Sequence, residues 1–178
     1  MPSTRKEKGK NDAMKLVVVR HSDALDVGQC GISTDEARIL SDAGRKKAEE
    51  VARGLALMGC RPNVIAASPL ARAMETAEII AKIIAPGTQV QRCDILAPGA
   101  TASRLLEWLR KLSADTVMVV GHMPDTACIA SELIAGKKNV GILFKKCGCC
   151  SIAFDEAPSM GAGVLEWLMQ PQHLRRIS

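Results

Sequence analysis

Three short apolar runs recur along the chain, and each is too short to form a buried helix. Their sequences are KLVVVR, NVIAAS and TVMVVG, at residues 15–20, 63–68 and 116–121. Because their apolar residues lack the alternation of a half-buried strand, these runs indicate strands that are covered on both faces. Strands of this kind are typical of parallel sheets with helices on either side.

Helical patterns and weaker strand patterns separate these runs. Ser41 is placed to cap a helix that Gly59 ends. Ser68 and Pro69 supply an N-cap followed by proline at the first helical position. The predicted helices cover residues 41–58, 68–84, 101–112 and 125–135, and the weaker strands cover 90–93, 149–154 and 163–168. The last two strands are expected to pair as a hairpin.

We therefore expect a single-domain α/β fold with three layers, α/β/α, and a mainly parallel sheet that ends in a late antiparallel hairpin. The domain is expected to span residues 14–178. Residues 1–13 contain four cationic and two acidic residues, and we expect them to form a disordered basic leader.

Composition excludes several classes of protein. The 178 residues contain no apolar run near the roughly 18 that a membrane span needs, and the N-terminus lacks an apolar signal core. A cytoplasmic protein without a membrane partner is predicted. The net charge is +5, but there is no tyrosine and there are only two phenylalanines and two tryptophans. Since nucleic-acid surfaces combine basic stripes with stacking aromatics, no nucleic-acid partner is predicted.

Four residues in the CGCC segment, Cys147 to Cys150, form the densest cysteine pattern among the seven cysteines. Zinc ligands normally come as two CxxC pairs, and the chain has no second pair. We interpret this segment as structural thiols rather than a metal site. No HxH or DxD ligand pattern occurs either, so no metal or other cofactor is predicted.

The three strong strands all end beside polar residues. Arg20 and His21 end the first, Ser68 and Arg72 follow the second, and His122 follows the third. Ligands of open α/β sheets bind at the carboxyl ends of the strands, so we expect these groups to meet. Guanidinium forks and helix N-termini both bind phosphate oxygens. The sequence therefore predicts an anion site.

Two histidines at such a site indicate phosphoryl transfer. A neutral imidazole can attack phosphorus and form a covalent phosphoenzyme, while a second, protonated imidazole can stabilise charge on the transferring group. Neighbouring cations would keep the first histidine neutral, because like charges disfavour its ionisation.

Five segments carry a resemblance to a known family: RHSDA (20–24), RILSDAG (38–44), SPLARAMETA (68–77), VVGHMP (119–124) and WLMQP (167–171). Together they resemble the histidine phosphatase superfamily, with its phosphoglycerate mutase-like fold, and more narrowly the short SixA-type phosphohistidine phosphatases. The resemblance implies that His21 is the phospho-accepting nucleophile. It implies that Arg20, Arg72 and His122 bind phosphoryl oxygens. Arg38 matches an arginine near the substrate mouth, and a surface loop cation is the alternative interpretation.

Two departures from the family pattern concern the mechanism. Ser22 replaces the glycine of the hallmark motif and would be strained if the position required a positive φ, but we expect it to be tolerated. The general acid of many phosphomonoesterases has no clear counterpart. Asp23 and Asp94 are candidates, although Asp23 is expected instead to cap nearby N–H groups.

Three further residues complete the sequence-based assignments. Glu75 and Thr76 match the family's ET pair and could orient Arg72 from the same helix face, or could simply pack or solvate that helix. His173 lies in a polar terminal segment and is expected at the surface.

The missing acid favours one class of substrate. An alkoxide leaving group needs a proton donor, whereas the imidazole of a protonated phosphohistidine leaves neutral. We therefore expect a metal-independent phosphohistidine phosphatase, acting through a covalent intermediate at His21. Its expected partner is a phosphohistidine-containing protein domain of the phosphorelay type. The alternatives are a small-molecule phosphomonoesterase and a non-catalytic phosphate-binding module of the same fold.

Overall fold

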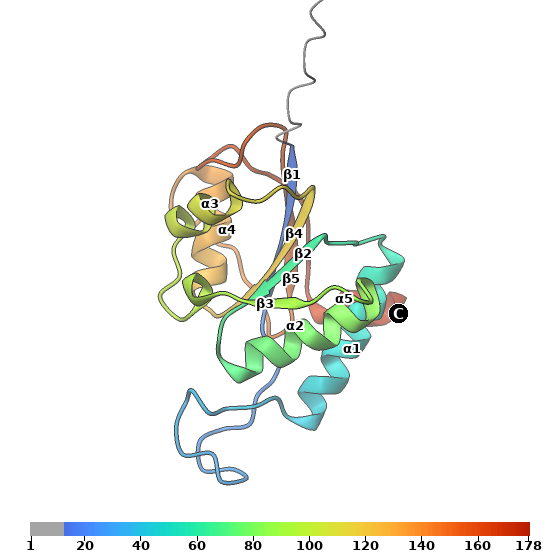
Figure 1. Ribbon diagram of the computed structural model, residues 1–178. Helices are drawn as coiled ribbons and strands as arrows, with labels where there is room; N and C mark the ends of the chain where they lie inside the picture. Colours follow the sequence, from blue (N-terminus) through green and yellow to red (C-terminus); the bar gives the residue numbers. More distant parts are fainter. Residues whose placement is uncertain (1–12) are drawn as a thin grey trace, which may run out of the picture.

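The computed structural model describes residues 13–178, which form one sheet between two layers of helices (Figure 1). The strands are β1 (Met14–Arg20), β2 (Val64–Ala67), β3 (Val90–Arg92), β4 (Thr116–Gly121), β5 (Cys149–Phe154) and β6 (Val164–Met169). The helices are α1 (Asp42–Leu57), α2 (Ala71–Ile84), α3 (Ala102–Leu109), α4 (Asp125–Ala135) and α5 (Pro171–Ile177), with a 3₁₀ turn η1 at Asp94–Leu96. The predicted basic leader lies outside the described residues except for Ala13.

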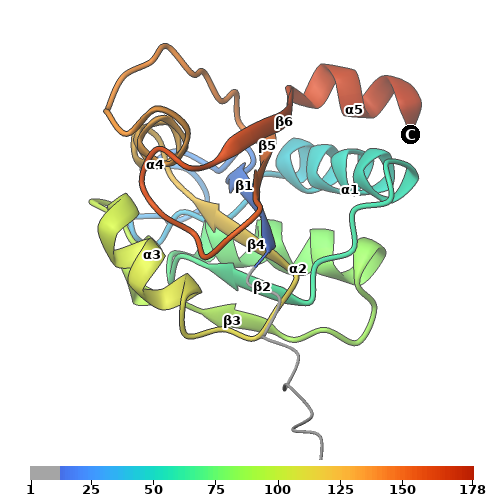
Figure 2. The same cartoon turned by 90° about the horizontal axis from the view of Figure 1, so that it is seen from above.

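The sheet has the strand order β3-β2-β4-β1-β5-β6. β1, β4, β2 and β3 pair in parallel, whereas β5 is antiparallel to both β1 and β6. Figure 2 shows α1, α2 and α5 on one face of the sheet and α3 and α4 on the other. The predicted three-layer fold with its late hairpin is confirmed. No helix within residues 13–178 has the length and apolar character needed to cross a bilayer.

β1 shows why its apolar run is continuous. Leu16 and Val18 pack in the core cluster of α3 and α4, whereas Val17 and Val19 pack in that of α1 and α2. All four side chains are at most 2% exposed. Burying each of them stabilises the fold by about 1.5–3 kcal/mol. The strand is therefore held from both sides, and so is the segment that follows it.

The second helix begins later than predicted. α2 starts at Ala71, and its N-cap is Leu70, which makes no side-chain cap bond. The Ser68 hydroxyl lies instead 2.7 Å from Nε2 of His122. The same hydroxyl also accepts from the Leu70 N–H at 3.4 Å. Because the helix begins only at Ala71, Pro69 belongs to the segment between β2 and α2.

The end of α3 and the presence of α5 also differ from the prediction. α3 ends at Leu109, because i→i+3 hydrogen bonds tighten residues 110–112 into turns. The sequence pattern does not predict α5, since its buried residues are only Pro171 and Leu174. α5 packs on α1 where the Leu174 carbonyl would be 2.5 Å from a Cβ at Gly54.

Gly44, in the LSDAG segment, lets the first turn of α1 approach the chain that follows β1. A Cβ at this position would lie 2.0 Å from the backbone oxygen of Asp23. The Ser41 hydroxyl caps α1 by accepting from the Gly44 N–H at 3.0 Å, as predicted. The Ser22 hydroxyl donates to the Gly44 carbonyl at 2.8 Å. α1 is therefore joined to the residues directly after His21.

We predict that Gly44→Ala lowers the free energy of unfolding by about 3 kcal/mol, because the methyl group has no room beside the Asp23 backbone. In an exposed helix interior the same change would stabilise by about 1 kcal/mol. Urea denaturation measures the difference. Gly87→Ala is the control: its site is open but its φ is +87°, so it should cost only about 1–2 kcal/mol. A Gly44→Ala variant as stable as the wild type would contradict the close approach.

Candidate active site

The carboxyl ends of β1, β4 and β2 bring two histidines and a serine together. Parallel pairing aligns Arg20 with Gly121, and the His21 N–H donates to the Gly121 carbonyl at 3.0 Å beyond the strand. The rings of His21 and His122 are consequently 5.1 Å apart between centroids. Nε2 of His122 is 2.7 Å from the hydroxyl of Ser68. These groups meet at the sheet edge where the sequence places them.

His21 is held as a neutral imidazole. Its ring is buried, and Nδ1 lies 2.6 Å from the backbone oxygen of Ser22. Because a carbonyl oxygen only accepts, Nδ1 carries the proton and Nε2 keeps its lone pair. Burial lowers the pKa of this ring to about 3, and the proximity of His122, Arg72 and Arg20 acts in the same direction. The ring is therefore a neutral candidate nucleophile at pH 7.

His122 is also neutral, contrary to the expectation of a protonated second histidine. Burial and the charge of Arg72 lower its pKa to about 4. Its Nδ1 is buried and has no hydrogen-bond partner within the part of the chain that the structure describes. A phosphoryl dianion beside the ring would raise its pKa by charge attraction. The protonated form therefore belongs to a complex with an anion.

Arg72 binds a carboxylate of its own chain. It lies in the first turn of α2 and is 5% exposed. Nη1 donates to the backbone oxygen of Asp35 at 2.6 Å, and Nη2 donates to its Oδ2 at 2.8 Å. Nε is buried without a partner among residues 13–178. Asp35 thus occupies the guanidinium fork that a phosphoryl group would need. No motif in the sequence identifies Asp35 as part of the site.

Arg20, the last residue of β1, is bound to the segment that precedes β5. Its Nη1 donates to the Phe144 carbonyl at 2.8 Å, while its Nε is buried with no partner in the described chain. Burial lowers the pKa of Arg20, and the charge of Asp23 partly offsets this effect. Both arginines therefore keep a buried donor that a bound oxyanion could satisfy.

Arg38 is engaged within the loop between β1 and α1. Its Nε donates to the Leu25 carbonyl at 2.6 Å, and its terminal nitrogens pair with Asp35 at 3.0 Å and Asp26 at 2.8 Å. Arg38 and Arg72 therefore share the Asp35 carboxylate. Arg38 is the first cause of the lowered pKa of this carboxyl, and Arg72 adds to it. A substrate-binding role for Arg38 stays a prediction.

Ser22 fits the hallmark position without strain, because its φ is not in the positive region. Its N–H donates to the hydroxyl of Thr76 at 3.0 Å, and that hydroxyl donates to the Arg72 carbonyl at 2.6 Å. Thr76 therefore ties the segment after His21 to the first turn of α2.

Glu75 does not orient Arg72, so this part of the ET interpretation is wrong. Its Oε1 accepts from the Leu40 N–H at 3.1 Å, and its Oε2 pairs with Arg45 at 2.8 Å. Thr76 contacts only the backbone of Arg72. Both members of the pair secure loops around the site rather than the guanidinium group.

Asp23, the first candidate acid, is held as a carboxylate. Burial opposes the ionisation of Asp23, but ion pairs with Lys47 and Lys146 outweigh it and hold the pKa below its ordinary value. The Asp94 carboxylate is 84% exposed and lies 3.7 Å from Nε of Arg92. The expected capping of N–H groups by the Asp23 side chain is wrong, because within residues 13–178 its carboxylate binds lysines and only its backbone oxygen accepts from the Ser41 N–H.

The cysteine segment lies in the core. Cys147, Cys149 and Cys150 are buried, and burial raises the pKa of Cys147 and Cys150 to about 12. These neutral thiols agree with the structural role predicted for the segment. Residues 13–178 contain no group of three His, Cys, Asp or Glu side chains suited to a metal ion.

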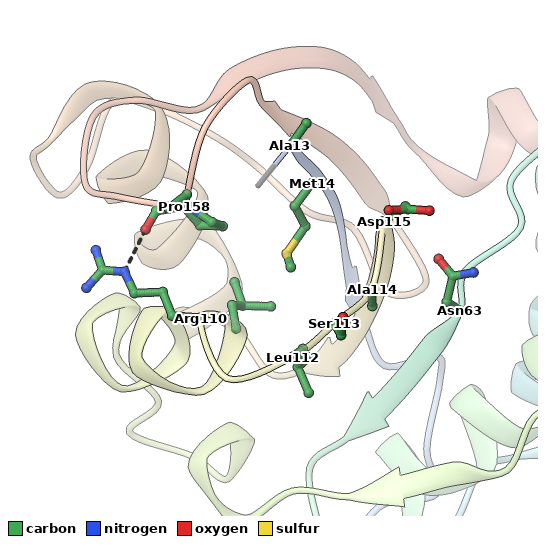
Figure 3. A pocket seen from close by; sticks show the side chains of 11 residues that line it. Ala13, Met14, Asn63, Arg110, Leu112, Ser113, Ala114, Asp115 and Pro158 are labelled. Atoms are coloured by element: carbon green, nitrogen blue, oxygen red, sulfur yellow. Dashed lines mark hydrogen bonds between the residues drawn. The ribbon is translucent and has the colours of Figure 1, made fainter. Parts of the chain in front are cut away.

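A pocket of about 340 Å³ lies at the opposite end of the sheet, at the amino ends of β1 and β4 (Figure 3). Met14, Asn63 and Asp115 line it, and the Arg110 side chain donates to the Pro158 carbonyl at 3.0 Å. None of the residues that line this pocket is a histidine. The rings of His21 and His122 lie instead beyond the carboxyl ends of β1 and β4.

Comparisons with known sequences identify a family. A family model described as "Histidine phosphatase superfamily (branch 1)" matches residues 16–97. An uncharacterized Picosynechococcus protein is 32% identical over 139 residues, which cover 76% of this chain and 82% of that protein. The mitochondrial serine/threonine-protein phosphatase Pgam5 of Drosophila mojavensis is 38% identical over 89 residues, or 49% of this chain and 29% of that protein. The chain therefore spans less than a third of that relative.

Solved structures show the same fold. The protein histidine phosphatase SixA complexed with tungstate matches with a TM-score of 0.78 at 24% identity, covering 90% of this chain and 99% of that one. A mutant phosphoserine phosphatase from Entamoeba histolytica in complex with phosphoserine matches with a TM-score of 0.65 at 18% identity, with the same coverages of 90% and 99%.

We predict that His21 and His122 stay neutral down to about pH 5 in anion-free buffer, since their pKa values are about 3 and about 4. Unfolded histidines have a pKa of about 6.5, so between pH 6.5 and 4 the unfolded chain binds more protons. Stability should therefore fall as the pH falls through this range. NMR of the ring C–H groups measures the titrations, and a His21 that titrates near pH 6.5 would contradict the described site.

We predict that Asp35→Asn tightens the binding of inorganic phosphate by about 3- to 10-fold, because it removes the charge that competes for Arg72. Titration calorimetry at pH 7 measures the affinity. Asp26→Asn is the matched control, since the Asp26 carboxylate pairs only with Arg38 among residues 13–178. Its effect on phosphate affinity should stay within about twofold. Unchanged or weaker phosphate binding by Asp35→Asn would show that Asp35 does not compete.

Proposed function

Because the chain belongs to the histidine phosphatase superfamily, we propose that it is a protein phosphohistidine phosphatase that acts through a phosphohistidine formed at His21. The observation that carries this proposal is the neutral His21 ring, whose Nε2 keeps a lone pair beside Arg20, Arg72 and His122. The shared fold with a protein histidine phosphatase supports the same reaction class.

In the first proposed step, the Nε2 lone pair of His21 attacks phosphorus and the P–N bond of the substrate breaks. The electron pair of that bond returns to the substrate imidazole, which leaves neutral because its other nitrogen carries a proton. Arg20 and Arg72 neutralise charge on the phosphoryl oxygens as the group transfers. The Asp35 carboxylate leaves the Arg72 fork as the phosphoryl group enters.

In the second proposed step, water attacks the phosphorus of the phosphoenzyme. The new P–N bond breaks, and its electron pair returns to Nε2 of His21, whose Nδ1 keeps its proton on the Ser22 carbonyl. The proton of the attacking water passes to the phosphate product. His21 therefore regains its starting tautomer without a separate acid.

The state of Asp23 supports phosphohistidine over a phosphate ester. An alkoxide has a conjugate acid pKa of about 16 and needs a proton to leave. Asp23 is ion-paired and ionised, so it has no proton to give at pH 7. An imidazole leaving group has no such need, since its conjugate acid pKa is about 6.5.

The proposed partner is a phosphohistidine-containing protein domain of the phosphorelay type, and the proposed location is the cytoplasm. The proposed reaction uses no metal or organic cofactor, because the cations that offset phosphoryl charge belong to the chain. Activity should therefore persist in EDTA.

A small-molecule phosphomonoesterase is the second candidate, favoured by the fold shared with the Entamoeba histolytica phosphoserine phosphatase. A substrate panel separates the two functions. Faster turnover of phosphoserine or a sugar phosphate than of a phosphohistidine peptide would overturn the phosphohistidine preference.

We predict that rapid acid-free quenching with a ³²P-phosphohistidine peptide labels the wild-type chain, whereas His21→Ala abolishes the label. The nucleophile is then missing although the site keeps its cations. His173→Ala is the control, because His173 is exposed on α5, and it should be labelled like the wild type. Turnover by His21→Ala at the wild-type rate would remove the proposed mechanism.

A further inference from the structure

A second concentration of positive charge adjoins the catalytic candidates. One pocket is lined by five cationic side chains that come from the end of β1, from α1, from the segment before β5 and from α5. These are Arg20, Lys47, Lys145, Lys146 and Arg175. Since Arg20 also lies near His21, this basic pocket borders the proposed phosphoryl site.

The basic pocket retains charge that its own chain does not neutralise. The five cations exceed the carboxylates paired with them by three. Lys145 has no carboxylate within salt-bridge distance in the described chain, and its Nζ is 3.4 Å from Oε1 of Gln172. The paired carboxylates are Asp23, shared by Lys47 and Lys146, and Glu50, bound by Arg175.

The kind of cationic side chain in the basic pocket favours carboxylates over a second phosphate as its ligand. A phosphate subsite typically presents guanidinium forks or converging backbone N–H groups. Here Arg20 is bonded to a carbonyl and Arg175 to Glu50, which leaves mainly lysine ammonium groups on flexible stems. The side chains of Lys47 and Lys146 are 25% and 39% exposed. Point charges spread over several elements suit acidic side chains on a protein surface.

We propose that the basic pocket binds acidic side chains that flank the phosphohistidine of the protein substrate. This inference rests on the proposed function, because it places the reacting histidine at His21 and the acidic residues at Lys145 and Lys146. Attraction between opposite charges across such a contact speeds association, and this attraction weakens as the salt concentration rises. The pocket therefore selects substrates by the charge beside the phosphohistidine.

Two phosphohistidine peptides that differ only in flanking glutamates or glutamines test the proposal with the full chain. At low salt the wild type should show a KM about 5-fold lower for the glutamate peptide, and this advantage should shrink as salt is added. Lys145→Gln combined with Lys146→Gln should remove the advantage through KM. Lys46→Gln combined with Lys82→Gln is the matched control, since both side chains are exposed outside the pocket, and it should keep the advantage.

Binding of the unphosphorylated peptides to His21→Ala separates docking from catalysis. The inference is supported if the glutamate peptide binds more tightly and this difference is lost when Lys145 and Lys146 are replaced. This result would support it even if the wild type hydrolysed neither peptide and the proposed function failed. Equal binding of the two peptides overturns the inference, even where both are hydrolysed. Binding of pyrophosphate through these lysines without selectivity between the peptides would make the pocket a small-anion subsite and would also overturn it.

Discussion

Hydrogen bonding to β4 continues one residue past the ends of β1 and β2, and the candidate site depends on this extension. The His21 N–H bonds to the Gly121 carbonyl, and the Ser68 N–H bonds to the Val120 carbonyl at 2.9 Å. The strands are buried on both faces, so their ends cannot shift without opening a close-packed core. The fixed carboxyl end of the sheet therefore holds two neutral imidazoles near the guanidinium groups of Arg20 and Arg72.

Strong local signals explain what the sequence predicts well. The continuous apolar runs predict the buried strands, and the carboxyl-end rule then brings His21 to His122. The parts that the sequence does not predict depend on contacts between distant segments. Asp35 has no motif, the Phe144 contact uses a backbone oxygen, and Ser68 resembles a helix cap until its contact with His122 is known. The short α5 lacks a clear period because few of its side chains are buried.

Charge balance links the site to its surroundings. Asp35 pairs with Arg72 from the loop between β1 and α1, and Asp23 pairs with both Lys47 and Lys146 in the basic pocket. In the proposed reaction, a phosphoryl group replaces Asp35 on Arg72, so the buried guanidinium is never left without an anion. The ion pairs of Asp23 explain, in the same terms, why this residue serves structure rather than proton donation.

In the proposed mechanism, Nε2 of His21 accepts the phosphoryl group, because Nδ1 donates to the Ser22 carbonyl. NMR of the trapped phosphoenzyme, with ³¹P and ¹⁵N detection, identifies the phosphorylated nitrogen directly. We expect one phosphorylated residue, His21, with phosphorus bonded to Nε2 and the proton retained on Nδ1. Phosphorus on Nδ1, or on any residue other than His21, would contradict it.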